Sequence, residues 1–483
     1  MTAPPVKTPD CFATDGGRGL PLYCVERTGF DAWRQLQLPE LGAWIDAQTF
    51  NAASGSVLLL PGNGGIAGAV LGIGDPQDPF SYAHAPFALP PGDWALATEL
   101  ADDAKRALHL GWGLGSYRFT RYKAPLRAPA RLITDAIDAE TLDVLAASVR
   151  VRDLVNTPAE DMGPDQLEQA CCELAEAHGA RIEVVSGDDL LKQNYPAIHA
   201  VGRASHRAPR LIALHWGDAG APKLAIVGKG VCFDTGGLDI KPADGMRNMK
   251  KDMGGAAHAI ALAGLVMARN LPVRLTLLVP AVENAIGPQS YRPGDVLNTR
   301  LGVSVEIDNT DAEGRVVLCD ALSYAVEQKP ALVIDFATLT GAARIALGPD
   351  LPALYANDES VATDWLEAAN AQRDPLWRMP LWRPYLRYLV SSIADIANGG
   401  PSRMAGSITA ALYLERFVPA TQPWAHIDVY AWNDSDRPGK PPATPALLHP
   451  RACPDDRCRS RHTRRCAPTV ASPARSVRGT APR

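Results

Sequence analysis

The sequence predicts an α/β protein with a small, variable N-terminal α/β domain and a larger second domain, whose mixed, mainly parallel sheet is flanked by helices. The chain has 483 residues, which is too long for one ordinary hydrophobic core. In its second part, apolar β-like runs alternate with helix-like runs. Continuous apolar strands separated by helices indicate a sheet that is covered on both faces.

The segment boundaries follow from changes in sequence pattern. Residues 1–130 mix short apolar runs with Gly/Pro punctuation and predict the N-terminal domain. Residues 131–153 contain "DAETLDVLAASVRVRD", which has apolar residues at helical spacing and predicts a helical connector. Residues 154–443 form the second domain, and residues 444–483 form a tail.

Strands and helices of the second domain can be assigned in order. The helical "DQLEQACCELAEAHG" precedes the strand "RIEVVSG". The nearly all-apolar "GGAAHAIALAGLVMARN" predicts a buried helix. The remaining predicted strands are "RLIALHW", "KLAIVGKG", "VRLTLLVPAV", "VSVEI", "ALVIDFATLTGA" and "WAHIDVYAW".

Composition limits the class of protein. With 46% hydrophobic and 21% charged residues, the chain is typical of a soluble globular protein. No apolar run reaches the length of a membrane span, and "MTAPPVKTPDCFATDGGRGLP" lacks the order of a secretory signal. Nine cysteines without regular spacing favour a reducing compartment. We therefore expect a cytoplasmic protein without a membrane partner.

Charge is distributed unevenly along the chain. The net charge is −5, but residues 444–483 hold nine arginines and two aspartates, and the rest of the chain has 39 basic and 51 acidic residues. An acidic body argues against nonspecific nucleic-acid binding. The tail lacks periodicity and is rich in Arg, Pro, Ser and Thr, which predicts disorder. Its Cys453, Cys458, His462 and Cys466 fit no standard zinc spacing, so a solvated tail is the favoured interpretation.

Three loops after apolar runs collect side chains suited to chemistry. The first, "VGKGVCFDTGGLDIKPADGMRNMKKDMGG", holds Lys229, Asp234, Lys241 and Asp252; the second, "NTDAEGR", holds Asp311, Glu313 and Arg315; the third, "FATLTGAA", has Thr338 to Gly341 at a strand end. Loops at the carboxyl ends of strands are the usual functional loops of such sheets.

Carboxylates dominate these loops. Asp, Asp, Asp and Glu are ligands for hard or borderline divalent cations, and four of them suit a two-metal site. Any one of these acids alone is more often a loop cap or a surface charge. Arg315 alone is more often an ion-pair partner, and Lys241 alone is ordinarily solvated. The combined spacing, rather than any single residue, predicts a site that holds cations.

At these residues the chain resembles the leucyl aminopeptidase family of cytosolic dimetal exopeptidases. "NTDAEGR" is similar to the family signature, and "VGKG…FDTGG…IKP…MKKDMGG" and "ATLTGA" match its other motifs in order. The resemblance covers roughly residues 154–436. It implies an enzyme that releases N-terminal leucine and other residues from peptides.

The resemblance also implies a role for each motif residue. Asp234 and Glu313 would bridge two divalent cations, Mn²⁺ or Zn²⁺. Asp311 would complete one site together with a backbone carbonyl, and Lys229 and Asp252 would complete the other. The implied pocket for the N-terminal side chain is formed by Met249, Asn309, Ala312, Thr338, Leu339 and Gly341.

Two further side chains would act without binding metal. Lys241 would stabilise the developing oxyanion. Arg315 would hold a bicarbonate that accepts the proton of the attacking water. The resemblance also implies a homohexamer with its active sites facing an interior cavity.

One segment departs from the family pattern. Where relatives have "HLDIAG", a Gly-rich segment and a helix, this chain has "HIDVYAWND" and the basic tail, as after a change of reading frame. We expect consequences for assembly and for part of the substrate pocket. Two alternatives remain open from the sequence: a DNA-binding regulator, favoured only by the arginine tail, and a dimetal hydrolase of another ester or amide.

Overall fold

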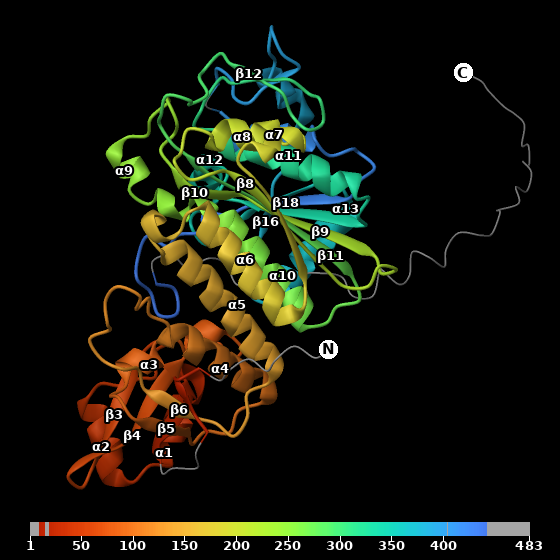
Figure 1. The fold of residues 1–483 in the computed structure, drawn as a ribbon. Coiled ribbons are helices and arrows are strands. Elements are labelled where there is room, and N and C mark those ends of the chain that lie inside the picture. The colour runs from red at the N-terminus through yellow and green to blue at the C-terminus, as the bar shows by residue number, and fades with distance from the viewer. Residues whose placement is uncertain (1–8, 15–18, 403, 442–483) are drawn as a thin grey trace, which may run out of the picture.

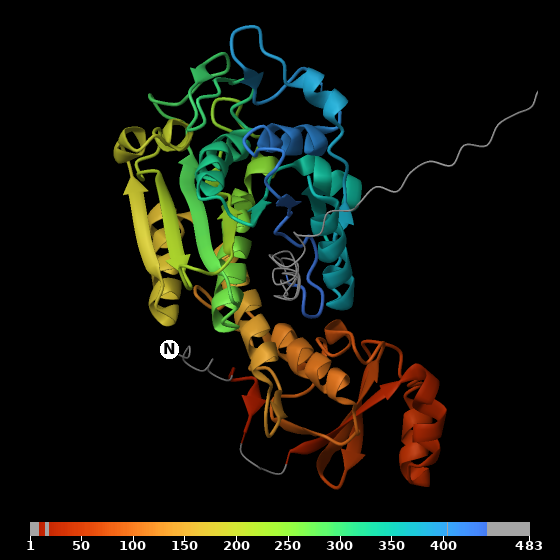
Figure 2. The same cartoon turned by 90° about the vertical axis from the view of Figure 1, so that its right-hand side faces the viewer.

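The computed structural model describes residues 9–14, 19–402 and 404–441, which fold into two domains joined by one long helix (Figures 1 and 2). The N-terminal domain packs at one end of that helix, and the larger domain packs against its other end. This arrangement confirms the predicted fold class. The tail and its cysteine–histidine set lie outside the described residues.

The N-terminal domain is built on a six-stranded sheet with the order β1-β6-β5-β2-β4-β3. Its neighbours pair in parallel except β3 and β4, which form an antiparallel pair. The strands are β1 (Phe12–Ala13), β2 (Leu20–Glu26), β3 (Val57–Gly62), β4 (Gly65–Ile73), β5 (Asp93–Leu96) and β6 (Arg131–Ile133), and the helices are α1 (Phe30–Gln35), α2 (Pro39–Ala47), α3 (Ala85–Ala88) and α4 (Asp102–Ser116).

The boundary expected at residue 130 lies before the end of this sheet. Strand β6 follows that position and pairs with both β1 and β5, so residues 131–133 belong to the N-terminal sheet. The run "RLI" is too short to stand out in the sequence, and only its pairing identifies it as a strand.

Helix α5 (Ala139–Asn156) connects the domains. It begins at Asp138, whose side chain accepts a hydrogen bond from the backbone N–H of Thr141 at 2.9 Å and so caps the first turn. Near its other end, the buried Arg152 donates to the carbonyl oxygens of Leu114 at 3.1 Å and Gly439 at 2.6 Å. One side chain thus ties the N-terminal domain to the far end of the described chain.

The second domain contains a nine-stranded mixed sheet, with the path β16-β15-β18-β14-β9-β11-β8-β7 and β10 beside β11. Strands β18, β14, β9, β11 and β10 run parallel to one another, whereas β15 pairs antiparallel with β18, and β8 pairs antiparallel with β11 and β7. The strands are β7 (Arg181–Ser186), β8 (Arg210–Trp216), β9 (Lys223–Gly228), β10 (Gly230–Asp234), β11 (Arg274–Asn284), β14 (Leu332–Ala337), β15 (Ala353–Ala356), β16 (Trp377–Arg378) and β18 (Trp424–Asp428).

Helices cover both faces of this sheet (Figures 1 and 2). On β9, Leu224 and Ile226 join the core that includes α5, α6 and α10, while Ala225 and Val227 join the opposite core that includes α8, α11 and α14. Because successive side chains of a strand point to opposite faces, a strand that is apolar at every position needs both cores. The helices are α6 (Pro164–His178), α7 (Asp189–Lys192), α8 (Pro196–Gly202), α9 (Ala243–Met246), α10 (Gly254–Ala268), α11 (Glu313–Glu327), α12 (Gly341–Leu347), α13 (Glu359–Ala371) and α14 (Gly406–Glu415).

A separate three-stranded sheet lies beside the main one and has the order β12-β13-β17. Its strands are β12 (Val296–Leu297), β13 (Val305–Glu306) and β17 (Ile396–Ala397). The predicted strand at residues 303–307 is therefore shortened to β13 and belongs to this small sheet. The "NTDAEGR" loop follows this small sheet, and does not follow a strand of the main one.

Candidate metal centre and substrate pocket

A cavity of about 860 Å³ opens at the carboxyl edge of the parallel strands, and every site residue predicted from the sequence lines it. Lys229 follows β9 directly, Asp234 ends β10, and Thr338 follows β14. Parallel neighbours end at the same edge of a sheet, so these three side chains meet although they are far apart in the sequence. The predicted residues on the cavity wall are Lys229, Asp234, Lys241, Met249, Asp252, Asn309, Asp311, Ala312, Glu313, Arg315, Thr338, Leu339 and Gly341.

The "NTDAEGR" loop reaches the same edge through hydrogen bonds. The backbone N–H of Thr310 donates to Asp239 Oδ2 at 2.7 Å, and its carbonyl oxygen accepts from the Tyr291 hydroxyl at 2.7 Å. Helix α11 then begins at Glu313, which places that carboxylate in the first turn. Position 314 requires glycine because the Lys229 side chain approaches it closely, and a Cβ there would lie 2.6 Å from Lys229 Nζ.

Three buried carboxylates form the acid cluster, which we define as Asp234, Asp252 and Glu313. One oxygen of each lies within 4.8 Å of the others. Asp252 is placed by Thr338, whose hydroxyl lies 2.8 Å from both Asp252 Oδ1 and the Asp252 carbonyl oxygen. Like charges this close repel in a buried site unless cations lie among them.

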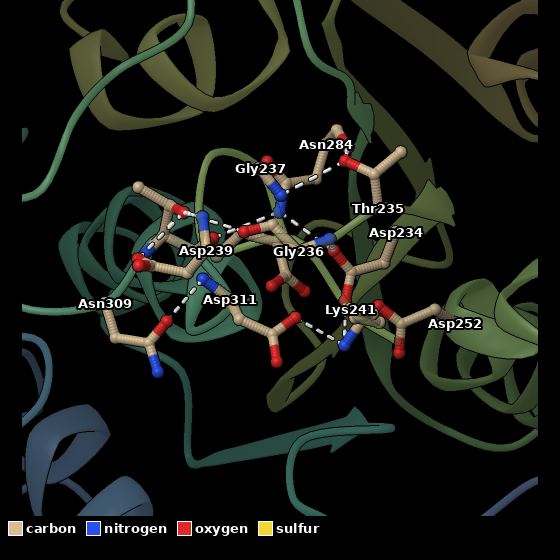
Figure 3. A network of polar contacts seen from close by, with 12 residues as sticks. Asp234, Thr235, Gly236, Gly237, Asp239, Lys241, Asp252, Asn284, Asn309 and Asp311 are labelled. Atoms are coloured by element: carbon tan, nitrogen blue, oxygen red, sulfur yellow. Dashed lines mark hydrogen bonds and ion pairs between the residues drawn. The ribbon is translucent and has the colours of Figure 1, made fainter. Parts of the chain in front are cut away.

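Two lysines supply positive charge to the cluster. Lys229 Nζ lies 2.7 Å from Asp252 Oδ2 and 2.8 Å from Glu313 Oε1, and it donates to the Thr338 carbonyl oxygen at 2.9 Å. Lys241 Nζ lies 2.8 Å from Asp234 Oδ2 and also pairs with Asp311 (Figure 3). Each ammonium thus bridges two carboxylates.

Burial and mutual repulsion change the proton affinity of these groups. Burial, and next the charge of Asp234, raise the pKa of Glu313 well above its usual range and that of Asp311 to about 6. Burial opposes the charged form of both lysines, but the surrounding carboxylates outweigh it and raise the pKa of Lys229 and Lys241. Without cations, the site therefore holds protons more tightly than exposed groups of the same types would.

The residues present fit divalent cations. Glu313 Oε2 is buried and has no hydrogen-bond partner among the described residues. Buried carboxylate oxygens without donors are what a hard cation requires. Five potential ligands, the acid cluster with Asp311 and Lys229, suit two cations better than one. A lysine ligand must be a neutral amine, and two adjacent dications would favour its deprotonation.

Arg315 lies on the first turn of α11 and faces the same cavity. Its Nη1 donates to the Asn398 carbonyl oxygen at 2.6 Å, while its buried Nε has no hydrogen-bond partner among the described residues. The described part of the chain also gives Arg315 no ion pair at 4.0 Å or less. Burial of the guanidinium lowers the pKa of Arg315 from its usual value.

Two polar residues that support the site were missed in the sequence. Asn284 ends β11, is buried, and donates through Nδ2 to Asp234 Oδ1 at 2.8 Å and to the Thr310 carbonyl oxygen at 3.0 Å (Figure 3). Asp428 ends β18 and accepts from the backbone N–H of Leu339 at 3.0 Å. Both are polar residues at the carboxyl end of an apolar strand, which is the signal that could have found them.

A third missed residue is Lys251, the second lysine of "MKKDMGG". It lies in the short 3₁₀ helix Met249–Met253, between the predicted pocket residue Met249 and the cluster residue Asp252. Its side chain lines the cavity, although Lys251 is only 7% exposed. Burial lowers the pKa of Lys251 to about 8.

Both domains of the chain match known protein families. The cytosol aminopeptidase family, catalytic domain, matches residues 149–446, and the M17 aminopeptidase N-terminal domain matches residues 20–135. The first match alone spans more than half of the chain. This chain belongs to the cytosol aminopeptidase family. The resemblance inferred from the motifs is confirmed.

Individual relatives agree with this family assignment. A probable cytosol aminopeptidase of Roseiflexus castenholzii is 39% identical over 359 residues, covering 70% of this chain and 73% of the relative. Peptidase B of Cronobacter sakazakii is 44% identical over 308 residues, covering 62% of this chain and 72% of the relative.

Solved structures of relatives share the fold over both domains. The crystal structure of the cytosol aminopeptidase from Coxiella burnetii has a TM-score of 0.88 and 47% identity, and covers 92% of this chain and 98% of its own. The bottromycin maturation enzyme BotP in complex with Mn has a TM-score of 0.79 and 32% identity, and covers 90% of this chain and 98% of its own.

Family membership defines the reaction. This cytosol aminopeptidase family member is a metal-dependent hydrolase that removes residues from the N-terminus of peptides. A two-metal mechanism is typical of the family. Within the described residues, no helix has both the length and the hydrophobicity that a membrane span needs.

Proposed function

We propose that the chain is a leucyl-type aminopeptidase, which releases leucine and other N-terminal residues with two divalent cations, Mn²⁺ or Zn²⁺. The observation that carries the proposal is the acid cluster, whose buried oxygens lie within 4.8 Å of one another on the wall of an open cavity of about 860 Å³. The manganese-bound relative supports Mn²⁺ as one candidate.

The ligand assignment follows the motif and agrees with the contacts. Asp234 and Glu313 are proposed as bridging ligands, since each carboxylate lies near a lysine and near other acids of the cluster. Lys229 and Asp252 would complete one cation site, and Lys229 Nζ lies 2.7 Å from Asp252 Oδ2. Asp311 completes the other site together with a backbone carbonyl. Asn284 holds Asp234 in position through its bond to Oδ1.

Bound cations of this kind polarise the scissile carbonyl and acidify a water. Lys241 is proposed to stabilise the oxyanion that develops on the substrate carbonyl, because its ammonium faces the cavity beside Asp234 and Asp311. Arg315 is proposed to bind bicarbonate as the proton acceptor. Its Nε is without a partner among the described residues, and its planar fork suits a small planar anion.

The substrate enters with its free amine toward the acid cluster and its first side chain toward the adjoining pocket. The proposed pocket walls come from the 3₁₀ helix Met249–Met253, the "NTDAEGR" loop and the loop after β14. The pocket residues are Met249, Asn309, Ala312, Thr338, Leu339 and Gly341. Binding of the free amine at cations held by these residues would restrict cleavage to the first peptide bond.

Assembly and location complete the proposal. We infer a homohexamer that acts on peptides in the cytoplasm. From the start of β16 to β17, five large apolar side chains are well exposed: Trp377, Trp382, Leu386, Val390 and Ile393. Such exposed apolar groups in one segment support an interface between copies of the chain. Light scattering of the purified protein measures the mass of the assembly.

The function is tested with a matched pair of substrates. Leucine p-nitroanilide should be hydrolysed in the presence of Mn²⁺ or Zn²⁺, and its N-acetyl derivative should not be hydrolysed. Removal of metal by a chelator should abolish turnover, and added Mn²⁺ should restore it. Equal rates on the free and the blocked anilide would instead identify a dimetal hydrolase without the exopeptidase requirement.

A further inference from the structure

Lys251 is a buried cation of the cavity wall that forms no ion pair with the described residues. Its side chain is 7% exposed, and the described residues give its ammonium no hydrogen bond and no ion pair within 4.0 Å. Lys251 Nζ lies over the ring of Tyr430, 4.9 Å from the ring centroid. A buried ammonium that has only an aromatic face as partner is costly unless a ligand supplies an anion.

The carboxylates nearest to Lys251 are engaged elsewhere. Asp252 Oδ1 lies 2.8 Å from the Thr338 hydroxyl, and Asp252 Oδ2 lies 2.7 Å from Lys229 Nζ. Asp428 accepts from the backbone N–H groups of Leu339 and Thr340 at 3.0 and 3.2 Å and from the Thr340 hydroxyl at 2.6 Å. These acids hold the loop after β14, and neither pairs with Lys251.

A second cation lies against the same aromatic ring. Arg344 Cζ lies 4.9 Å from the Tyr430 centroid, and Arg344 Nη1 donates to the Tyr430 hydroxyl at 3.0 Å. That hydroxyl donates in turn to Asp434 at 2.9 Å. Arg344 is exposed on the cavity rim, whereas Lys251 is buried below it. Tyr430 thus holds one guanidinium and one ammonium on the wall of the same cavity.

We propose that this wall selects peptides with an acidic N-terminal residue, aspartate or glutamate, whose side-chain carboxylate is received by Lys251 and Arg344. The proposal rests on the proposed function, because it assigns the substrate class of that same site. The cations proposed for the floor of the cavity would neutralise the acid cluster and leave Lys251 and Arg344 to set the charge of the adjoining wall. Apolar neighbours such as Met249 and Leu339 still accept leucine, so the wall adds a preference and does not exclude other residues.

The test compares isosteric substrates that differ only in charge. Anilides of α-linked glutamate and glutamine, and of aspartate and asparagine, are assayed with the Mn²⁺-loaded enzyme, with leucine anilide as reference. These substrates carry no C-terminal carboxylate, so any preference for the acid reports on the side-chain pocket. We expect kcat/KM to favour glutamate over glutamine by about tenfold to a hundredfold, the usual range for a charge-assisted hydrogen bond.

Lys251→Met keeps the length of the side chain and removes its charge. It should reduce the glutamate-to-glutamine ratio of kcat/KM by at least about tenfold, and Arg344→Met at the rim should reduce it less. Because the ratio is taken within one protein sample, it is insensitive to the fraction of folded enzyme. If Lys251→Met fails to fold, Lys251→Gln and Arg344→Met carry the same comparison.

A binding measurement tests the same preference for the acid when a variant turns over too slowly to be assayed. Free glutamate and glutamine are titrated as product inhibitors or by thermal shift, and glutamate should bind the wild type more tightly but not Lys251→Met. Hydrolysis of leucine and glutamine anilides without any preference for the acids overturns this inference and leaves the proposed function intact. Lack of hydrolysis of every free-amine anilide overturns the proposed function instead. An unchanged ratio in Lys251→Met shows that the lysine only packs on Tyr430 and overturns the assignment.

Discussion

The acid cluster and the Tyr430 wall, which consists of Lys251, Arg344 and Tyr430, lie in the same cavity but balance their charges in opposite ways. In the cluster, Lys229 and Lys241 each bridge two carboxylates, so the excess of acids is partly neutralised within the protein. On the wall, the described residues give Lys251 no acid partner at all. A buried site with excess negative charge is suited to cations, and a wall with excess positive charge is suited to an anionic group of the substrate.

The largest expected effect comes from removing a proposed bridge of the cluster. Glu313→Ala should reduce activity to near background and lose at least one metal, because the remaining ligands no longer link the two cation sites. Elemental analysis and leucine anilide turnover measure both effects. Glu327→Ala, at the exposed end of the same helix, is the matched control and should retain both metals and activity. Two metals and wild-type turnover in Glu313→Ala would refute the site assignment.

Variants of the two lysines that pair with the acid cluster, Lys229 and Lys241, should separate cation binding from catalysis. Lys241→Ala should keep its metal content and lose about 10²–10³-fold in kcat, the magnitude expected for oxyanion stabilisation. Lys229→Ala should instead raise the metal concentration that is needed for activity, because it removes a proposed ligand. The activity of both variants is measured as a function of metal concentration. Identical titration curves for the two variants would contradict this division of roles.

Arg315 is a cation of the same cavity, and it lies two residues after Glu313 of the acid cluster in helix α11. Arg315→Ala should keep its metals and should no longer respond to added bicarbonate. Its rate should fall about a hundredfold, which is the low end of what a positioned base contributes to catalysis. Rates are measured against bicarbonate in carbonate-depleted buffer. If Arg315 served only to hold the loop through the Asn398 carbonyl, the variant would lose thermal stability and its remaining activity would still rise with bicarbonate.

The smallest expected effect concerns stability and pH. Burial, and next the charge of Asp234, raise the pKa of Asp311 from 3.8 to about 6 in the folded protein. The metal-free protein therefore loses stability as pH rises from about 4 to about 6, because the unfolded chain ionises this group first. Asp311→Asn removes this loss, and the variant should gain about 1–3 kcal/mol relative to wild type over that range.

Chelated proteins are compared by thermal unfolding at both ends of this pH range. Added Mn²⁺ should reverse the order of stability, since the ionised carboxylate then has a cation to bind. A difference between variant and wild type that stays constant from pH 4 to 6.5 would show that Asp311 titrates as an exposed acid does.

The site could be predicted from the sequence to the extent that its residues stand in recognisable loops. All thirteen predicted residues line one cavity, because the loops after β9 and β14 share the carboxyl edge of a parallel sheet. Patterns of apolar residues also gave the main strands and helices, since an element buried on both faces must be apolar throughout.

Other features depended on contacts between distant segments. Strand β6 has three residues, and only its pairing with β1 and β5 places it in the N-terminal sheet. Asn284 stands at the end of an apolar strand in the sequence, but only the packing of β11 shows that its partner is Asp234. No local pattern records such partners, because they come from segments dozens of residues away.

By itself, the sequence determined the α/β class, the family and the ligand types, because these depend on periodicity and on residue identity within short motifs. Only the tertiary structure decided which charges have partners. Lys229 and Lys251 are both lysines near Asp252, yet the first bridges two carboxylates and the second lies against Tyr430. Electrostatic energy depends on distance and burial, and both are set by packing between segments that the sequence keeps far apart.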